Sequence, residues 1–472
     1  MAVQVALMRS VNPATEEPVA TYPVHSEREV GEVLDAAIAA LPGWRATSVA
    51  ERCALLVRVA RLLRQGSEQL AQLVTAEMGK PIAEARAEVE KCAFSCEWFA
   101  EHAPGFLADQ PSPSDSPRSF VAFEPLGVVF AGMPWNFPLW QVFRFAAPSL
   151  AAGNCAVLKH ASSVSGCALA IAQLFESAGF PEGVFGVVLI PNERVGAVIE
   201  DPRIAAVTLT GSTAAGRSVA AAAGRSLKPA VLELGGSDAF VVLEDADIAA
   251  AASTAARARF QNAGQSCIAA KRFIVVEDVA DEFEELLVAE ARRVVVGDPL
   301  DASVTMGPLA RSDLRDTIER QLTESIAAGA TLRAGGTRPD ARGYFFTPAV
   351  LTGCTFDMSA FREETFGPLA AVMRVASADE AIAAANHSDF GLGGNIWTRD
   401  EERGVALARQ FQSGGVFVNG MTHSDPRLPF GGVKDSGYGR ELSSFGIHEF
   451  VNVKTIWRPA LDAVGAGPTP VE

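Results

Sequence analysis

Hydrophobic residues recur at helical spacing through the first hundred positions. Ser26 with Glu29, and Ser48 with Glu51, form capping-box pairs ahead of two runs in which apolar residues return every three or four positions. Gly79 is expected to end a third helix. The sequence therefore predicts a helical N-terminal region.

A fourth helix and a proline-rich segment follow. Pro81 can open this helix, which carries Cys92 and Trp98. The segment Pro104–Pro117 has the composition of a crossing arm or linker, and no helix is expected within it.

Beyond this segment, short apolar runs alternate with helix-like spacers in two series. The first series contains five runs: Val128–Ala131, Ala156–Lys159, Val184–Ile190, Ala206–Thr210 and Val231–Leu234. The second contains five more: Phe240–Leu243, Phe273–Val276, Ala371–Val375, Asn395–Thr398 and Val416–Asn419. Strands that alternate with helices predict parallel, doubly wound sheets, and hence an α/β protein with two such domains.

The segment Phe450–Trp457 alternates like a β-strand, and the sequence shows no partner for it. It is either an exposed ribbon that pairs with another subunit or an ordinary edge strand of the second sheet.

Composition narrows the class of protein. At roughly 150 residues per domain, 472 residues predict two or three domains. With 49% hydrophobic and 20% charged residues, a large core can form. The formal net charge of -16 disfavours a broad nucleic-acid or anionic-membrane surface, although it permits a local cationic pocket.

Cysteine and histidine usage argues against disulfides and metals. The seven cysteines are scattered and odd in number, and with six histidines we expect no metal site. The N-terminus lacks the pattern of a secretory signal, and apolar stretches such as Phe145–Leu158 are too weak for a membrane span. We expect a soluble, cytoplasmic protein.

Cys267 is the strongest candidate for chemistry. Most cysteines in such proteins are inert, small hydrophobic residues. Cys267, however, follows the polar, flexible lead-in Gln261–Ser266, whereas a structural cysteine usually has core residues on both sides. This setting suits a nucleophile that is partly exposed and close to backbone N–H donors.

Two further residues could act beside such a nucleophile. Glu233 ends an apolar strand just before two glycines, at the edge where α/β proteins place ligands; it is either a general base or a solvated strand end. Asn136 lies in a loop stiffened by Pro134 and Pro138 and could donate to an oxyanion, although alone it is only a turn residue.

A weak dinucleotide signal follows one predicted strand. Gly211, Ser212 and Gly216 lie between a strand and a helix, which suits phosphate binding at a helix N-terminus. The spacing differs from the usual glycine fingerprint. Lys159 ends an earlier strand, from which it could reach ribose hydroxyls.

Taken together, these motifs resemble the aldehyde dehydrogenase superfamily from Asn12-Pro13 to the Phe450 strand. The matching segments are PWNFP, LKHAS, GSTAAG, LELGGSD, FQNAGQSC, EETFGP and PFGGVKDSGYGRE. WNFPLWQVFR, LKHAS and SDPRLPFGG are most similar to bacterial succinate-semialdehyde dehydrogenases that use NAD or NADP. The resemblance implies oxidation of succinate semialdehyde to succinate; a broader specificity for other short semialdehydes or aliphatic aldehydes is the alternative.

The resemblance also implies roles. Cys267 attacks the aldehyde, Asn136 holds the oxyanion, and Glu233 activates water for hydrolysis of the thioester. The residues implied in cofactor binding are Trp135, Lys159, Ser162, Gly211, Ser212, Leu234, Glu364 and Phe366. Many NAD-preferring relatives have a glutamate at the position of Ser162. Because serine does not repel a 2′-phosphate, we expect NADP to be accepted and preferred.

For the substrate, Arg144 is the expected cation for the terminal carboxylate, with Ser424 and Trp140 assisting. A structural ion pair of Arg144 is the alternative. Arg427 is a weaker candidate, since it could simply brace its loop.

The implied organisation has three parts. Residues 1–117 and 131–235 form the cofactor-binding domain, 236–430 the catalytic domain, and 118–130 with 450–472 a small β oligomerisation arm, which favours a homodimer over a tetramer.

Other activities are less consistent with the sequence. Ala269 excludes a vicinal disulfide beside Cys267. Thioester release to CoA is a minor alternative. A thiol hydrolase would have no use for Lys159 and Glu364, and a non-catalytic relative would be expected to have lost Cys267 or Glu233.

Overall fold

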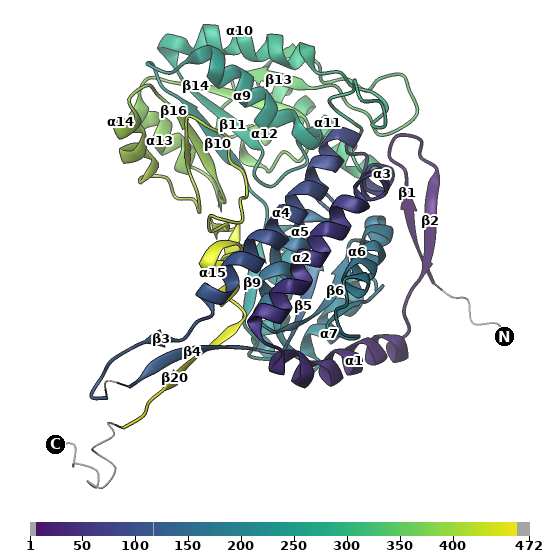
Figure 1. Ribbon diagram of the computed structural model, residues 1–472. Helices are drawn as coiled ribbons and strands as arrows, with labels where there is room; N and C mark the ends of the chain where they lie inside the picture. Colours follow the sequence, from purple (N-terminus) through teal and green to yellow (C-terminus); the bar gives the residue numbers. More distant parts are fainter. Residues whose placement is uncertain (1–5, 117, 460–472) are drawn as a thin grey trace.

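Four helices form the N-terminal region of the computed structural model, which describes residues 6–116 and 118–459. These helices are α1 (Glu27–Ala46), α2 (Val49–Gln65), α3 (Ser67–Met78) and α4 (Ile82–Phe106). Both capping boxes are present, and Gly79 ends α3 with a left-handed φ of 81°. A short hairpin, β1 (Leu7–Val11) with β2 (Pro18–Pro23), lies beside α3 and α6 (Figure 1).

The first predicted sheet has six strands, in the order β19-β9-β8-β5-β6-β7. Its strands are β5 (Val128–Met133), β6 (Cys155–His160), β7 (Phe185–Val187), β8 (Ile204–Thr210), β9 (Ala230–Glu233) and β19 (Gly437–Tyr438). All neighbours are parallel except β19, which runs antiparallel to β9. The helices between these strands are α5 (Trp140–Ala151), α6 (Ser165–Ser177), α7 (Val195–Glu200) and α8 (Thr213–Arg225).

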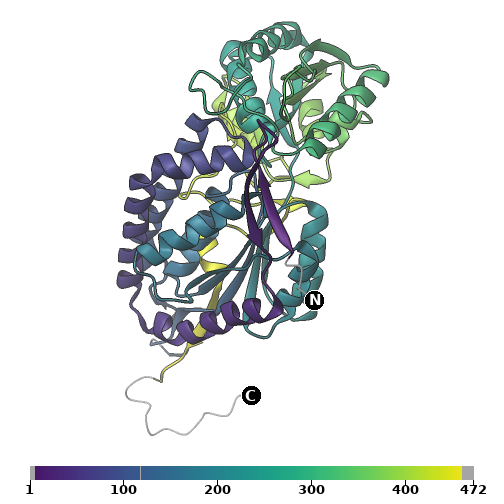
Figure 2. The ribbon, with the colours of Figure 1, turned by 90° about the vertical axis from the view of Figure 1, so that its right-hand side faces the viewer.

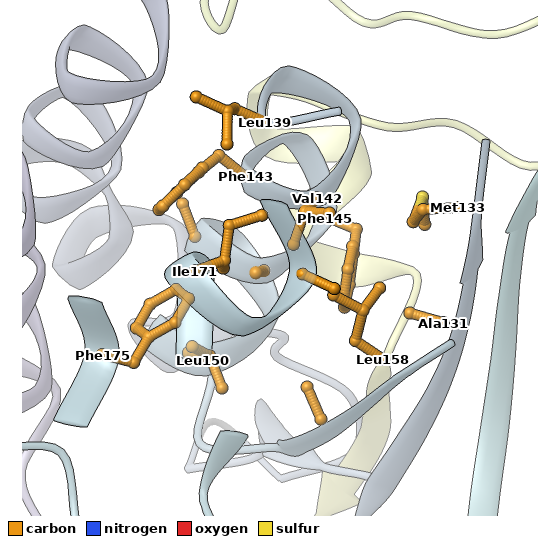
Figure 3. Close-up of a cluster of buried hydrophobic side chains, with 14 of the residues drawn as sticks. Ala131, Met133, Leu139, Val142, Phe143, Phe145, Leu150, Leu158, Ile171 and Phe175 are labelled. Carbon is orange, nitrogen blue, oxygen red and sulfur yellow. The ribbon is translucent and has the colours of Figure 1, made fainter. Parts of the chain in front are cut away.

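The core of this part lies between α5, α6 and the sheet. Figure 3 shows side chains from the two helices and from β5 and β6 converging on one another, among them Phe143, Leu158, Ile171 and Phe175. Every residue of α5 is buried, so the residues at its start are held rigidly.

The second predicted sheet has seven strands, in the order β12-β13-β14-β11-β10-β16-β17. The strands are β10 (Asp238–Val242), β11 (Ala270–Val276), β12 (Thr331–Ala334), β13 (Ala349–Thr352), β14 (Leu369–Val375), β16 (Gly394–Trp397) and β17 (Phe417–Val418). Its helices are α9 (Ile248–Phe260), α10 (Glu277–Arg293), α11 (Ser312–Ala327), α12 (Ser359–Arg362), α13 (Ala378–Asn386) and α14 (Glu401–Ala408). All neighbours are parallel except the edge pair β12–β13, which the sequence pattern did not predict.

The chain therefore forms two α/β lobes, as Figures 1 and 2 show, and the predicted fold class is confirmed. After the second sheet, the chain returns to the first through β18 (Val433–Lys434) and then β19. Strand β18 pairs with β15 (Phe390–Gly391). Helix α15 (Ser443–His448) follows.

A three-stranded sheet projects from the first lobe (Figure 1). It consists of β3 (Gln110–Pro111), β4 (Phe120–Pro125) and β20 (Val451–Ile456), with β4 in the middle. Strand β20 therefore pairs with β4, and the alternative of an edge strand of the second sheet is wrong. Residues 460–472 of the predicted arm lie outside the described residues.

The prediction that no helix enters Pro104–Pro117 is also wrong. Helix α4 continues through Pro104 to Phe106, and Leu107 donates to the Ala103 carbonyl. Pro104 cannot donate the usual helical hydrogen bond, and burial of Phe99 and Ala103 on the same helix offsets that cost.

Candidate active site

Two cavities meet at Cys267. The first, called here the Lys91 cavity, has a volume of about 110 Å³ and is bordered by Lys91, Trp140, Arg144 and Ser424. The second, the Glu364 cavity, measures about 260 Å³. Its wall includes Trp135, Asn136, Gly211, Ser212, Leu234, Glu364 and Phe366. Cys267 borders both cavities.

The loop before Cys267 has an unusual backbone. Asn262, Ala263 and Gly264 are consecutive left-handed residues, with φ values of 53°, 53° and 72°. For the first two this conformation is strained, and the surroundings must hold it. Of the seven cysteines, all free and all within the described residues, Cys267 is the one that is partly exposed.

Two buried cations hold this loop. Arg259 donates to the Gly264 carbonyl at 2.7 Å. Lys271 donates to the carbonyls of Ser266 at 2.9 Å and Cys267 at 2.7 Å, and its ammonium lies 3.4 Å from the Glu364 carboxylate. Sequence reasoning missed both residues, although a lysine and an arginine beside buried strand and helix positions are a signal in themselves.

The thiol of Cys267 is protonated at neutral pH. Burial raises its pKa to about 11, against the opposing effect of the nearby Arg144 and Lys271 cations. The thiolate, which is the nucleophile, is therefore a minor species in the free protein.

Asn136 lies beside Cys267 with its amide fixed at both ends. Its Nδ2 donates to the Gln265 carbonyl at 3.0 Å, and its Oδ1 accepts from Gln141 Nε2 at 3.0 Å. An amide nitrogen carries two hydrogens, so one N–H is left to face the Glu364 cavity, which Asn136 borders. This is the arrangement expected of a preorganised oxyanion donor.

Glu233 is buried at the end of β9 and borders neither cavity. A methyl group built on Gly431 would lie 2.7 Å from its Oε1, so the carboxylate faces that glycine. Neither of its oxygens has a hydrogen-bond partner among the described residues. Burial, and then the Glu441 carboxylate, raise the pKa of Glu233 well above its usual range. The structure thus brings Cys267 and Asn136 together at one cavity, and Glu233 lies near enough to influence the pKa of Cys267 without bordering either cavity.

The predicted cofactor residues fall into two groups. Those of the Glu364 cavity lie together. The rings of Trp135 and Phe366 pack edge to face at 5.8 Å, and Gly236 N–H donates to the Glu364 carboxylate at 3.0 Å. Ser212 caps the N-terminus of α8. Gly216 has no room for a side chain, because an added Cβ would lie 2.4 Å from Leu234.

Lys159 and Ser162 form the second group, outside this cavity. Lys159 Nζ donates to Asn192 Oδ1 at 2.5 Å, while Ser162 is exposed at the start of a short 3-10 helix. The groups of the Glu364 cavity suit a nicotinamide dinucleotide. The Glu364 carboxylate can accept from sugar hydroxyls, the N-terminus of α8 can bind phosphate, and the Trp135 and Phe366 rings can pack against a flat heterocycle. The residues present therefore fit that cofactor.

The predicted substrate residues Arg144, Trp140 and Ser424 all border the Lys91 cavity. Trp140 Nε1 donates to Ser424 Oγ at 2.9 Å. Arg144 forms a buried ion pair with Glu441 and donates to Thr210 Oγ1 at 3.0 Å, so the ion pair left open above is present.

Two other cations near the Lys91 cavity differ from what the sequence indicated. Arg427 is exposed, pairs with Asp425 in its own loop and does not border the cavity. Lys91 borders it, and sequence reasoning missed this residue because a lysine on a helix is ordinarily a surface residue.

The described residues contain neither a metal-ligating cluster nor a membrane-spanning helix. No group of three or more metal-ligating side chains occurs within residues 6–116 and 118–459. Over the same part of the chain, no helix is long and apolar enough to cross a membrane.

Comparisons with known proteins agree on one family. Residues 2–456 match the aldehyde dehydrogenase family. A succinate semialdehyde dehydrogenase of Escherichia coli (strain K12), named for NAD(P)+, is 47% identical over 449 residues, which is 95% of this chain and 97% of that protein. One from Mycobacterium bovis, named for NADP(+), is 49% identical over 451 residues, or 95% of this chain and 99% of that protein. The crystal structure of a Streptococcus pyogenes succinic semialdehyde dehydrogenase with NADP+ superposes with a TM-score of 0.94 at 38% identity, covering 96% of this chain and 100% of that one.

Proposed function

The chain belongs to the aldehyde dehydrogenase family, and from this premise we propose that it oxidises succinate semialdehyde to succinate with NADP+ or NAD+. One observation carries the proposal. Cys267 borders two cavities. The residues of the Glu364 cavity suit a dinucleotide, and the Lys91 cavity is lined by cations and hydrogen-bond donors. A nucleophile in that position can meet an aldehyde from one side and a hydride acceptor from the other.

In the proposed reaction the Cys267 thiolate attacks the aldehyde carbon, and the carbonyl electron pair moves to oxygen. The free N–H of Asn136 and the backbone N–H of Cys267 hold that oxyanion. When bound, the nicotinamide cofactor accepts the hydride that leaves the same carbon. The carbonyl then re-forms as a thioester on Cys267.

Hydrolysis completes the cycle. For this step the Glu233 side chain, which faces Gly431 in this structure, turns toward Cys267 and takes a proton from water. The hydroxide adds to the thioester carbon, and the Cys267 thiolate departs as the acid forms. The raised pKa of Glu233 supports this role, since a base of higher pKa holds the proton more readily. The overall reaction consumes one aldehyde, one oxidised nucleotide and one water.

For the cofactor, we propose that Glu364 and Lys159 bind the two riboses and that Ser212 lies at the pyrophosphate. NADP+ is the preferred form. Burial lowers the pKa of Lys159, against the opposing effect of the Glu193 carboxylate, and Ser162, three residues further along the chain, adds no carboxylate that would repel a 2′-phosphate. The NADP(+) named for the similar enzymes supports this preference.

For the substrate, the proposal assigns Trp140 and Ser424 to the wall of the binding site. Arg144 lies at the same wall as a cation whose charge is balanced by Glu441.

Domain roles and assembly are part of the same proposal. The lobe with the six-stranded sheet binds the dinucleotide, the lobe with the seven-stranded sheet supplies Cys267, and the enzyme is a cytoplasmic homodimer. The projecting sheet supports the dimer, because β20 is its edge strand and exposes Val453 and Trp457.

A substrate panel tests the proposal. Succinate semialdehyde, shorter and longer semialdehydes, and the uncharged aldehyde butanal would each be assayed with NADP+ and NAD+ by the absorbance of the reduced nucleotide. We expect the highest kcat/KM for succinate semialdehyde with NADP+. A kcat/KM for butanal equal to that for succinate semialdehyde would reject the substrate.

A further inference from the structure

Lys91 is a cation at the wall of the Lys91 cavity, which Cys267 also borders. It lies on α4, is half-buried, and places its ammonium 4.2 Å from the centre of the Trp140 ring. Its Nζ donates to Ser424 Oγ at 2.9 Å. The residue is therefore held in place rather than free in solvent.

No carboxylate forms an ion pair with Lys91. Among the described residues, none lies within 4.0 Å of its ammonium, whereas three other buried cations near the site each have one. These pairs are Lys80–Glu88, Arg144–Glu441 and Lys271–Glu364. Burial, and then the charge of Arg144, lower the pKa of Lys91 to about 8, so its charge is held at a cost. A bound anion would offset that cost.

The hydrogen bonds leave donors for such an anion. An ammonium has three N–H groups, and only one of those on Lys91 is used by Ser424. Ser424 Oγ accepts from both Lys91 and Trp140, so its own hydrogen is free to point elsewhere. The cavity that contains Cys267 thus offers N–H and O–H donors beside an unbalanced positive charge.

Arg144 is a second cation of the same cavity, and it is fixed by other groups. Its guanidinium is paired with Glu441, bonded to Thr210 and stacked 4.7 Å from the centre of the Phe430 ring. Its charge still acts at the cavity, because it influences the pKa of both Cys267 and Lys91.

We propose that Lys91, with the Ser424 hydroxyl, recognises the terminal carboxylate of the substrate as a second cation beside Arg144. The inference rests on the proposed function for the identity of the aldehyde. It extends to any aldehyde with an anionic group at the far end of its chain.

The first test compares two substitutions with a matched control. Lys91→Met removes the charge and keeps the length of the side chain, while Lys91→Arg keeps the charge. Arg86→Met removes an exposed cation of the same helix that pairs with Glu68. Each variant would be assayed on succinate semialdehyde and on butanal.

Lys91→Met should lower kcat/KM for succinate semialdehyde by about 10- to 100-fold, the usual effect of a lost charge-assisted hydrogen bond, mainly through KM. Its kcat/KM for butanal should stay within about threefold, Lys91→Arg should recover most of the loss, and Arg86→Met should change neither. Equal losses on the two aldehydes would overturn the proposal.

The second test compares the pH dependence of the wild type with that of Lys91→Arg. The groups that face Lys91 are Arg144 from α5, Glu88 and Cys92 from α4, and Asp425 from the loop after β17. Because Lys91 loses its charge near pH 8, the ratio of kcat/KM for succinate semialdehyde to that for butanal should fall about tenfold between roughly pH 7 and pH 9.5. The ratio cancels the titration of Cys267, which both aldehydes share. A constant ratio would contradict the proposal, as would a fall that persists in Lys91→Arg.

These results can be separated from failure of the proposed function. A wild-type enzyme that prefers another carboxylated aldehyde would reject succinate semialdehyde as the substrate. The Lys91 inference would then be judged in the same way on the preferred aldehyde.

Discussion

Replacing Asn136 with alanine removes the proposed oxyanion donor. In the native protein its amide is oriented by two hydrogen bonds of 3.0 Å, to the Gln265 carbonyl and from the Gln141 side chain. The remaining N–H needs no reorganisation when negative charge develops on the substrate oxygen. Loss of one such donor costs about 3 to 4 kcal/mol of transition-state stabilisation, or roughly 10²- to 10³-fold in kcat.

Asn136→Ala should lower the unfolding free energy by less than it lowers transition-state stabilisation. The substitution leaves the buried Gln141 amide without its partner, which costs about 1 to 3 kcal/mol of unfolding free energy, while the Gln265 carbonyl still accepts from the Asn262 side chain at 3.2 Å. The assay measures kcat and KM with succinate semialdehyde and NADP+, with thermal unfolding of each variant recorded alongside.

Gln141→Leu is the graded control. It removes only the bond that orients Asn136 Oδ1, and the donor itself stays in place. We expect a loss in kcat of about tenfold or less for this variant. If Asn136→Ala kept kcat within about tenfold of the wild type, or lost no more than Gln141→Leu, the oxyanion role of Asn136 would be refuted.

Three more predictions follow from the same site. Lys271→Met should release the two carbonyls that its ammonium holds, lowering kcat by at least about tenfold and the unfolding free energy by about 2 to 5 kcal/mol; unchanged values in a urea titration and a rate assay would contradict this. Ser162→Glu should shift the ratio of kcat/KM for NADP+ over NAD+ toward NAD+ by at least about tenfold, because the new carboxylate repels a 2′-phosphate near Lys159, and an unchanged ratio would reject that argument. Because burial raises the pKa of Cys267 to about 11, its alkylation by iodoacetamide should accelerate about tenfold per pH unit between roughly pH 7 and pH 10, whereas a rate that levels off above about pH 9 would show an ordinary thiol.

The sequence predicted the elements whose signals are local. The capping boxes at Ser26 and Ser48 and the left-handed stop at Gly79 each depend on a few consecutive residues, and all three are present in the structure. Pro104 is the exception, since the packing of α4 outweighed the local signal. The edge strand β12 is largely exposed and has no apolar alternation, so no pattern indicated it.

Long-range partnerships could not be predicted in the same way. Strand β20 meets β4 across more than three hundred residues of chain, and Arg144 meets Glu441 across a similar distance. The motifs located Cys267, Asn136 and Glu233, but they did not show that Glu233 borders neither cavity. Lys91 was missed because only the packing of α4 against α5 turns that position toward Cys267.

The most direct test concerns the Cys267 sulfur. The enzyme would be mixed with succinate semialdehyde and NADP+, quenched with acid within the first turnover and digested for mass spectrometry, with Cys267→Ala treated in parallel. We predict a succinyl group on the peptide that contains Cys267, and no reduced nucleotide from the alanine variant. Nucleotide reduction by Cys267→Ala at the wild-type rate would contradict the account.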